Sequence, residues 1–253
     1  MRFASLGSGS LGNGLVVEAG ATRLLVDCGF STDDTERRLA RLGLAPGDLA
    51  GIVVTHEHGD HADGCLPFVR KHGLRIWMTH GTARALGDAA SSGAAIVDSH
   101  TPFPVGDLEV RPFPVPHDAR EPVQFDVTDG ARRLGILTDT GAATRHIEAV
   151  LSGCDALVLE CNHDPDLLAA GPYPQWLKMR IAGPFGHLAN ATAAAILAAV
   201  DRSRLRHVIA AHLSQTNNLP GLATAALAGA LGCVPEEILV AEQASGFGWL
   251  ALS

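Results

Sequence analysis

The stretch Thr55-His56-Glu57-His58-Gly59-Asp60-His61 (the metal loop) places four potential metal ligands within six residues. It follows the apolar run Ile52-Val53-Val54, which is typical of a buried strand. The ligands therefore lie at the carboxyl end of a strand, where α/β sheets hold their chemistry. The first two histidines can face one side of an extended backbone, and the Asp-His pair can face a neighbouring point. Solvated loop histidines are the alternative, which the density of the cluster disfavours.

The composition restricts the class of protein. The chain has 253 residues, 47% of them hydrophobic, which is enough for a substantial core. Its formal net charge of −8 argues against nucleic-acid binding through bulk positive charge. Two bound divalent cations would nevertheless place strong positive charge at one point of an acidic protein. The five cysteines show no Cys-x-x-Cys spacing, so we expect small core residues, not disulfides or a zinc ribbon.

The hydropathy pattern gives no sign of a membrane segment. The amino terminus has no long apolar region, and the longest mostly apolar stretch, residues 221–234, is shorter than a membrane span requires. We therefore expect a cytoplasmic protein with no membrane partner. Nothing in the pattern fixes the oligomeric state, which leaves a homo-oligomer open.

The first part of the chain reads as a meander followed by a helix. Strands are expected at residues 3–6, 14–18 and 22–26. The Gly/Ser-rich residues 7–13 between the first two favour a hairpin turn over a phosphate cradle, because the lysine of a P-loop is missing. Asp27, at a strand end, is either a support for the metal loop or an ordinary terminal residue. A helix is expected from Ser31 to Gly43, with Arg37, Arg38 and Arg41 on a solvated face.

Five strands deliver Asp, Glu or His at their carboxyl ends. The residues concerned are His56 after 52–54, His117 after 110–113, Asp139 after 133–137, Glu160 after 156–159 and His212 after 208–211. Helices are expected at 64–72, 190–200 and 222–231, and a hairpin joins 123–127 to 133–137. Because strands and helices alternate without a linker, we expect a single α/β domain over 1–253, with two sheets covered by outer helices.

The ligand types indicate a two-metal site. The seven residues are His56, His58, Asp60, His61, His117, Asp139 and His212. Imidazole and carboxylate groups suit borderline metals such as zinc, manganese or iron. A carboxylate between two histidine sets can give one oxygen to each ion, and two close ions can share a hydroxide nucleophile at neutral pH. We therefore expect two divalent metal ions, zinc or manganese, as cofactors.

The His-x-His-x-Asp-His motif with the later His117, Asp139 and His212 resembles the metallo-β-lactamase-fold hydrolases. The resemblance implies an αβ/βα four-layer sandwich of two mixed sheets flanked by helices. It also implies that His56, His58 and His117 hold the first ion and that Asp60, His61 and His212 hold the second. Asp139 would bridge the two ions.

Further stretches narrow the resemblance to the YycJ-like (WalJ) family. They are Leu6-Gly7-Ser8-Gly9-Ser10-Leu11-Gly12-Asn13, Glu160-Cys161-Asn162-His163-Asp164, Gly171-Pro172-Tyr173-Pro174, Leu177-Lys178-Met179-Arg180, Gly186-His187-Leu188-Ala189-Asn190 and His212-Leu213-Ser214-Gln215-Thr216-Asn217-Asn218. Cys161 and Ala189 stand where the family pattern has Ser. The resemblance implies a metal-dependent phosphodiesterase, in particular a 5′-to-3′ exonuclease with a DNA strand as its substrate.

The residues themselves offer groups for such a reaction. The candidate catalytic residues are Asp60, His163 and His187, since either histidine could protonate a leaving 3′ oxygen. The candidate substrate-binding residues are Lys178, Arg180, Asn162, Asn190, Ser214 and Asn217. Alternatives are a solvated helix face for Lys178 and Arg180, a helix cap for His187, and turn formation by Asn217. Glu160 is expected to act behind the ligands.

Other functions remain open at this point. Within the fold they are a cyclic-nucleotide phosphodiesterase, a tRNA 3′-processing endonuclease, and a thioester or lactone hydrolase that needs no cationic phosphate clamp. A binding module without catalysis is disfavoured because every ligand position is intact. Only 72 residues separate Asp139 from His212, which leaves no room for the domain inserted in larger RNA-degrading relatives.

Overall fold

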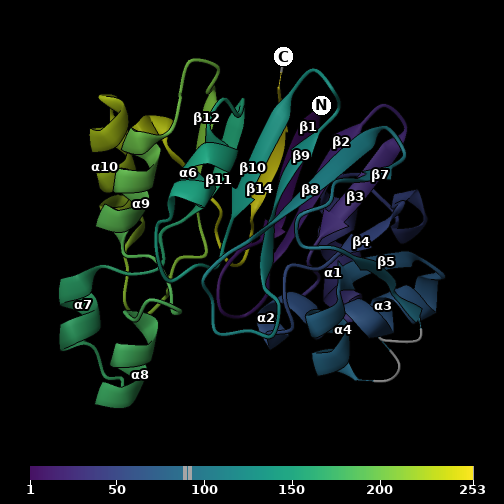
Figure 1. Cartoon of the computed structure of the whole chain (residues 1–253), viewed down its shortest axis with the longest axis horizontal. Coiled ribbons are helices and arrows are strands. Elements are labelled where there is room, and N and C mark those ends of the chain that lie inside the picture. The colour runs from purple at the N-terminus through teal and green to yellow at the C-terminus, as the bar shows by residue number, and fades with distance from the viewer. Residues whose placement is uncertain (88–89, 91–92, 253) are drawn as a thin grey trace.

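A computed structural model describes residues 1–87, 90 and 93–252 and consists of two β-sheets packed face to face (Figure 1). The first sheet has the order β14-β1-β2-β3-β4-β5-β6 and the second β13-β12-β11-β10-β9-β8-β7. The strands of the first are β1 (Arg2–Gly7), β2 (Gly14–Ala19), β3 (Thr22–Val26), β4 (Gly51–Val53), β5 (Arg75–Thr79), β6 (Ala95–Val97) and β14 (Phe247–Ala251). Those of the second are β7 (Phe103–Val105), β8 (Leu108–Pro114), β9 (Val123–Thr128), β10 (Arg133–Leu137), β11 (Ala156–Glu160), β12 (His207–Ala211) and β13 (Leu239–Val240).

Helices cover the outer face of each sheet. The helices are α1 (Thr32–Arg41), α2 (Gly59–Ala62), α3 (Cys65–His72), α4 (His80–Leu86), α6 (Arg145–Leu151), α7 (Pro165–Ala170), α8 (Gln175–Ile181), α9 (Asn190–Ala199) and α10 (Pro220–Leu231), with 3₁₀ turns at Pro46–Asp48 and Pro235–Glu237. In Figure 1, α1, α3 and α4 lie beside the first sheet, and α9 and α10 lie beside the second. Over the described residues, no helix has the length and apolar character needed to cross a membrane.

Three hydrophobic layers separate these four layers of secondary structure. Successive side chains of a strand point to opposite faces, so Val53 of β4 packs between the two sheets while Ile52 packs under the helices. The central layer contains residues of both sheets, such as Phe3 and Phe125, and a third layer lies between the second sheet and α9. This arrangement confirms the predicted αβ/βα sandwich.

The strand directions explain why the candidate ligands meet. Strands β3 to β6 run parallel to one another, and so do β10 to β13. The carboxyl ends of parallel strands lie at one edge of their sheet, and loops leave from there. The metal loop follows β4, Asp139 and His212 lie just after β10 and β12, and Glu160 is the last residue of β11.

Several local predictions are confirmed. Strands β1 and β2 pair antiparallel with Phe3 opposite Val17, so the Gly/Ser-rich residues 7–13 connect a hairpin. The Ser31 hydroxyl accepts a hydrogen bond from the amide of Asp34 and caps α1. Four of the five cysteines are buried, and all are free thiols.

The prediction of a solvated arginine face on α1 is confirmed for the exposed Arg37 and Arg41 but is wrong for Arg38, whose side chain is only 14% exposed. Arg38 Nη1 donates to the carbonyls of Leu6 (2.6 Å) and Ala244 (2.9 Å), and its guanidinium stacks over the ring of Phe30. Arg41 Nη2 also donates to Leu6 O. These carbonyls belong to the end of β1 and to the loop before β14, which only the tertiary fold brings to the helix.

The two ends of the chain meet in a pairing that the sequence pattern did not reveal. Strand β14 pairs antiparallel with β1, with Phe3 opposite Leu250. It therefore belongs to the first sheet, although it follows every strand of the second sheet in the sequence. Helices α7 and α8 were also not predicted as separate elements. They project from the sandwich below α9 (Figure 1), and α8 buries none of its side chains.

Candidate metal centre

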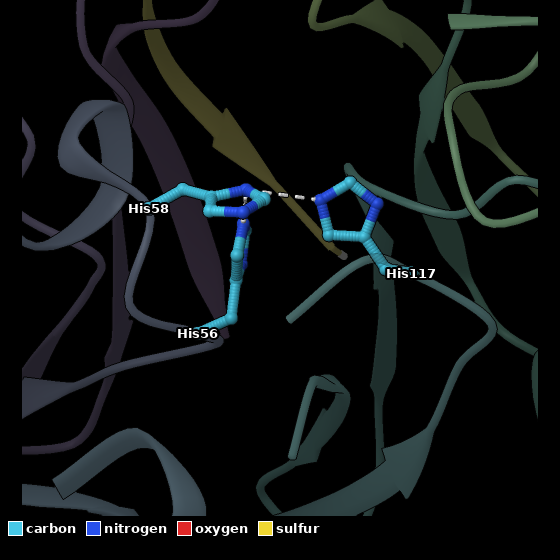
Figure 2. A group of neighbouring side chains, drawn as sticks. All are labelled: His56, His58 and His117. Atoms are coloured by element: carbon cyan, nitrogen blue, oxygen red, sulfur yellow. Dashed lines mark hydrogen bonds between the residues drawn. The ribbon is translucent and has the colours of Figure 1, made fainter. Parts of the chain in front are cut away.

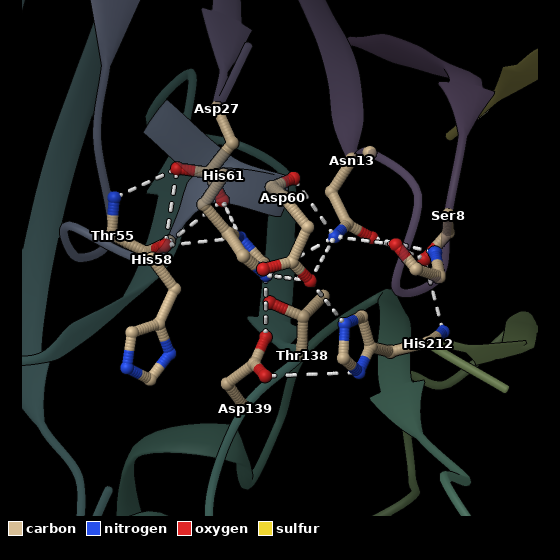
Figure 3. A network of polar contacts seen from close by, with 12 residues as sticks. Ser8, Asn13, Asp27, Thr55, His58, Asp60, His61, Thr138, Asp139 and His212 are labelled. Carbon is tan, nitrogen blue, oxygen red and sulfur yellow. Dashed lines mark hydrogen bonds and ion pairs between the residues drawn. The ribbon is translucent and has the colours of Figure 1, made fainter. Parts of the chain in front are cut away.

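Asp27 supports the metal loop through contacts with Thr55 and His61 (Figure 3). Its carboxylate accepts hydrogen bonds from the amide of Thr55 (2.8 Å) and from the Thr55 hydroxyl (2.9 Å). The other partner of this carboxylate is His61 Nδ1, at 2.8 Å. Asp27 adopts a positive φ of 61°, which is unfavourable for a residue with a side chain, so the fold imposes this orientation. The predicted supporting role of Asp27 is confirmed.

The metal loop changes conformation halfway, which separates its two ligand pairs. His56 and His58 lie on an extended segment after β4, and His58 is the N-cap of α2. Asp60 and His61 lie in the first turn of that helix, and their side chains approach His212. Gly29 lets the loop approach, because a Cβ at this position would lie 1.8 Å from the carbonyl oxygen of Asp60.

Three histidines form the first ligand group (Figure 2). His58 Nδ1 lies 3.0 Å from His56 Nε2 and 3.2 Å from His117 Nε2. The other ring nitrogen of His117, Nδ1, lies 3.0 Å from the carbonyl of Gly186, which fixes Nδ1 as the donor and leaves the Nε2 lone pair free. Burial lowers the pKa of His56 and of His117, which favours the neutral rings that a metal ion would need as ligands.

Asp60, His61 and His212 form the second group. His212 Nε2 lies 3.1 Å from Asp60 Oδ2. The backbone of His212 has a positive φ of 54°, and its amide donates to the hydroxyl of Ser8 at 2.9 Å. Asn13 Nδ2 lies 3.1 Å from His61 Nε2 (Figure 3). The loop between β1 and β2 thus supports this group through side chains.

Asp139 lies between the two groups. Its Oδ2 is 2.9 Å from His61 Nε2, and its Oδ1 is 3.8 Å from His117 Nε2. Asp139 Oδ2 is buried, and among the described residues it has only the ion-pair contact with His61 and no hydrogen bond of good geometry. A buried carboxylate oxygen without a donor is costly unless a cation satisfies it. The residues therefore fit a dinuclear site bridged by Asp139.

The electrostatics of the cluster also favour bound cations. Burial opposes ionisation of Asp139, yet His212 and His61 hold the pKa of its carboxyl well below the usual range. Burial likewise opposes charge on His212, but Asp139 and Asp60 raise its pKa to about 9. Both shifts have the same cause, which is the negative charge of the buried carboxylates. Divalent ions would neutralise this charge once the imidazole rings have lost their extra protons and bind as neutral ligands.

Glu160 and His187 extend this network toward the second sheet. His187 Nδ1 lies 2.8 Å from Glu160 Oε1 and 3.3 Å from Asp139 Oδ1. Burial disfavours the charged imidazole, but the carboxylates of Glu160 and Asp139 raise the pKa of His187 to about 10. The alternative that His187 caps a helix is wrong, because α9 begins at Asn190 and its N-cap is Ala189.

Asp118 is a functional candidate that sequence analysis missed. Its Oδ1 lies 3.7 Å from His117 Nε2 and 3.9 Å from His58 Nε2, and its Oδ2 accepts from Arg180 Nε at 2.5 Å. The only feature of the sequence that could have indicated a role for Asp118 was its position directly after His117. The contact brings Arg180, which is half exposed, to the first histidine group.

The remaining candidates occupy different surroundings. Asn162 donates to the carbonyl of His212 at 3.1 Å, and Asn190 forms a reciprocal amide pair with Asn218, both bonds at 2.9 Å. Ser214 accepts from Asn217, whose side chain is fully buried. These contacts hold the loops after β11 and β12 together, and substrate binding by Asn162, Asn190, Ser214 and Asn217 stays a prediction.

A sequence profile described as the beta-lactamase superfamily domain matches residues 22–212. Over 227 residues the chain is 37% identical to exodeoxyribonuclease YycJ of Bacillus anthracis. The aligned region covers 88% of this chain and 86% of the relative. The chain is a YycJ-like member of the beta-lactamase superfamily. Exodeoxyribonuclease WalJ of Streptococcus pneumoniae is 32% identical over 88% of this YycJ-like chain and 85% of its own length.

Solved structures support the same fold. The metallo-β-lactamase-fold protein YhfI from Bacillus subtilis superimposes with a TM-score of 0.74 over 99% of both chains at 15% identity. Zinc-bound PqqB from Methylobacterium extorquens gives a TM-score of 0.72 over 99% of this chain and 100% of its own, at 18% identity. Together with the His/Asp clusters, the family identifies this YycJ-like protein as a hydrolase dependent on divalent metal ions.

Proposed function

We propose that this protein is a dinuclear metal-dependent phosphodiesterase that removes nucleotides from the 5′ end of a DNA strand. The observation that carries the proposal is the position of Asp139, whose buried carboxylate faces both histidine groups. The choice of DNA is supported by the two relatives named exodeoxyribonucleases, which match this chain over most of their length.

In this proposal His56, His58 and His117 hold one ion, Asp60, His61 and His212 hold the other, and Asp139 bridges them. Bound zinc or manganese would supply Lewis acidity and a water of lowered pKa for attack on the phosphate. Asp60, whose side chain is 23% exposed, is our catalytic candidate among the ligands, as the carboxylate that would orient the attacking water through a hydrogen bond. Asp27 keeps the His61 ring oriented throughout.

His187 is our candidate for the general acid. Glu160 Oε1 holds its Nδ1, so the opposite ring nitrogen is free to donate a proton to the leaving 3′ oxygen. The raised pKa of His187 means that the ring carries this proton at neutral pH. His163, the other candidate, has no hydrogen bond or ion pair to the cluster among the described residues, so we assign it no proton transfer.

Arg180 is our candidate for phosphate binding at the site. Its guanidinium is held by Asp118 next to His58 and His117, and about half of it is exposed. A guanidinium can offer two parallel N–H donors to non-bridging phosphate oxygens. We place the reaction in the cytoplasm, on one DNA strand, and leave open whether a homo-oligomer forms.

The test uses single-stranded DNA with a 5′ phosphate, labelled in one sample at the 5′ end and in another at the 3′ end. Protein loaded with manganese or zinc should release the 5′ label at once as a mononucleotide, while the 3′-labelled strand shortens stepwise. Chelator and Asp139→Asn should abolish both signals. Asp63→Asn, an exposed carboxylate close to the metal loop but outside the clusters, is the matched control and should leave them unchanged.

Two results would contradict the proposal. Early release of the 3′ label would reverse the polarity. Absence of any DNA cleavage, with two metal ions per chain measured by elemental analysis, would point to a small phosphodiester or a thioester as the substrate.

A further inference from the structure

A pocket of about 280 Å³ lies between α7 and α8, outside the ligand groups. Its apolar wall includes Leu168 and Ala169 of α7 and Met179 of α8, with Ala182 at the end of that helix. Three polar side chains, His163, Gln175 and Lys178, also line the pocket, and His163 and Lys178 bring a ring and a charge to it. The metal chemistry described above uses neither of these groups.

The ring of His163 is buried, and it forms no hydrogen bond with any residue that the structure describes. His163 is 3% exposed, and its Nδ1 accepts and donates no hydrogen bond. Its backbone is nevertheless fixed, because its carbonyl accepts from the amide of Asn190 at 2.9 Å. Burial lowers the pKa of His163, so the neutral ring offers one donor and one acceptor. A fixed, buried imidazole without a partner is costly in the free protein and is suited to a polar ligand.

Lys178 brings positive charge to the same pocket. Its ammonium donates to the carbonyl of Ala169 at 2.6 Å, which ties α8 to α7 and holds the charge at the pocket. An ammonium has three donors, and Lys178 forms no ion pair within residues 1–87, 90 and 93–252. By contrast, Arg180 on the same helix is paired with Asp118. The charge of Lys178 is therefore available to an anionic ligand.

The pocket shares its supporting segments with the metal centre. The amide of His187 donates to the carbonyl of Ile181, in the last turn of α8, at 2.8 Å. On the other side, Asn162 precedes His163 in the chain and donates to the carbonyl of His212. A ligand in the pocket would thus lie beside the residues that surround the scissile phosphate.

We propose that this pocket binds the 5′-terminal nucleotide of the DNA strand. The base packs against Leu168 and Met179, His163 hydrogen-bonds to a polar edge of the nucleoside, and Lys178 faces the terminal phosphate. The inference rests on the proposed function and adds to it the selection of a strand end. An apolar wall with few polar groups is typical of ligand sites, and a pocket of about 280 Å³ that opens to solvent can take the base and sugar of one terminal nucleotide.

The kinetic test compares two phenylalanine substitutions in α7. Ala169→Phe fills the pocket and preserves the backbone carbonyl that Lys178 uses, whereas Ala170→Phe makes the same change at the next exposed position, outside the lining. Ala169→Phe should raise KM for a 5′-phosphorylated strand by about tenfold or more, the effect expected when a ligand loses a buried contact. Ala170→Phe should stay near the wild-type KM. Equal KM values for the two variants would overturn the proposal.

A binding test separates this inference from the proposed function. Calorimetry measures thymidine 5′-monophosphate and thymidine binding to metal-loaded protein. The monophosphate should bind about tenfold more tightly than the nucleoside, as expected for a charge-assisted bond, and Lys178→Met should remove that difference. His163→Phe, which keeps the ring shape, should weaken both ligands. Elemental analysis checks that each variant keeps its metal content.

The outcomes of the two tests are distinct. If wild-type protein degrades no DNA, the proposed function is wrong. The calorimetric measurement then still tests whether the pocket binds the monophosphate. Monophosphate binding that is lost in Ala169→Phe and kept in Ala170→Phe supports the pocket. Monophosphate binding that both variants keep overturns it, as does a nucleoside affinity equal to that of the monophosphate in wild-type protein.

Discussion

The metal loop and the α7–α8 segment both border the metal centre, but they are fixed in different ways. Asp27 holds the metal loop through Thr55 and His61, and both His56 and His61 are completely buried. In α8 no side chain is buried, and Trp176 and Met179 are 65% and 64% exposed. The difference indicates that the ligands are positioned before substrate arrives, whereas the α7–α8 segment presents an open surface. Enzymes commonly hold their catalytic groups on a rigid framework and bind substrate with more exposed segments.

The largest effect should come from Asp139→Asn, which changes the carboxylate that we propose as the bridge between the two metal ions. The amide keeps the shape but removes the negative charge that both histidine groups face. We expect a loss of kcat on the order of 10³-fold, as for other groups that stabilise charge in a transition state. Nuclease assays and elemental analysis measure it. Wild-type rates with full metal content would exclude Asp139 as a bridge.

A smaller effect is expected for Asp27→Asn, which alters the support of the metal loop without touching a ligand position. The Thr55 amide binds Oδ1 and His61 binds Oδ2, so a side-chain amide, which has one oxygen, cannot accept from both, and the His61 ring loses its orientation. Loss of such a support typically costs about 10–100-fold in metal affinity or activity. Metal titration of the variant measures this. An unchanged affinity would mean that the loop holds its geometry without Asp27.

The close packing under the metal loop predicts a stability effect at Gly29. In Gly29→Ala the new Cβ would overlap the carbonyl of Asp60, so the loop must move, at about 1–3 kcal/mol of unfolding free energy. Gly47→Ala is the matched control, since no atom lies within 4 Å of its Cβ position. Thermal unfolding compares the two. Equal Tm values would show that the loop yields without strain.

The smallest effect is expected in α8. Because Trp176 is 65% exposed, Trp176→Ala should change the unfolding free energy by no more than about 0.5 kcal/mol. The contrasting variant is Phe68→Ala in α3, where the ring is fully buried and its loss should cost about 3–5 kcal/mol. Denaturant unfolding of both variants sharpens the comparison. A large loss for Trp176→Ala would mean that α8 is part of the stable core.

The sequence predicted the parts of the site that depend on local pattern. The metal loop is contiguous, and it follows a β-branched run whose burial on both faces is evident from composition. His117, Asp139 and His212 could be added because each follows a strand, and parallel strands end at one edge. The sandwich followed from the same alternation of strands and helices.

The parts that were not predicted depend on contacts between distant segments. Arg38 looked solvated because its acceptors, Leu6 and Ala244, are far from it in the chain. The contact of Asp118 with Arg180 joins residues 62 positions apart. The pairing of His187 with Glu160 likewise requires the loop after α8 to return to β11. Helical periodicity and turn signals contain no information on such pairs.

The pairing of β14 with β1 has a consequence for folding kinetics. The first strand of the chain cannot acquire this neighbour until residues 247–251 have been synthesised, so the first sheet closes last. Contacts of such long sequence separation slow folding and leave an unpaired strand edge on the nascent chain. They also join β1 and β14 in one cooperative unit. We therefore expect amide hydrogens of β1 and β14 to exchange together, through a common opening event.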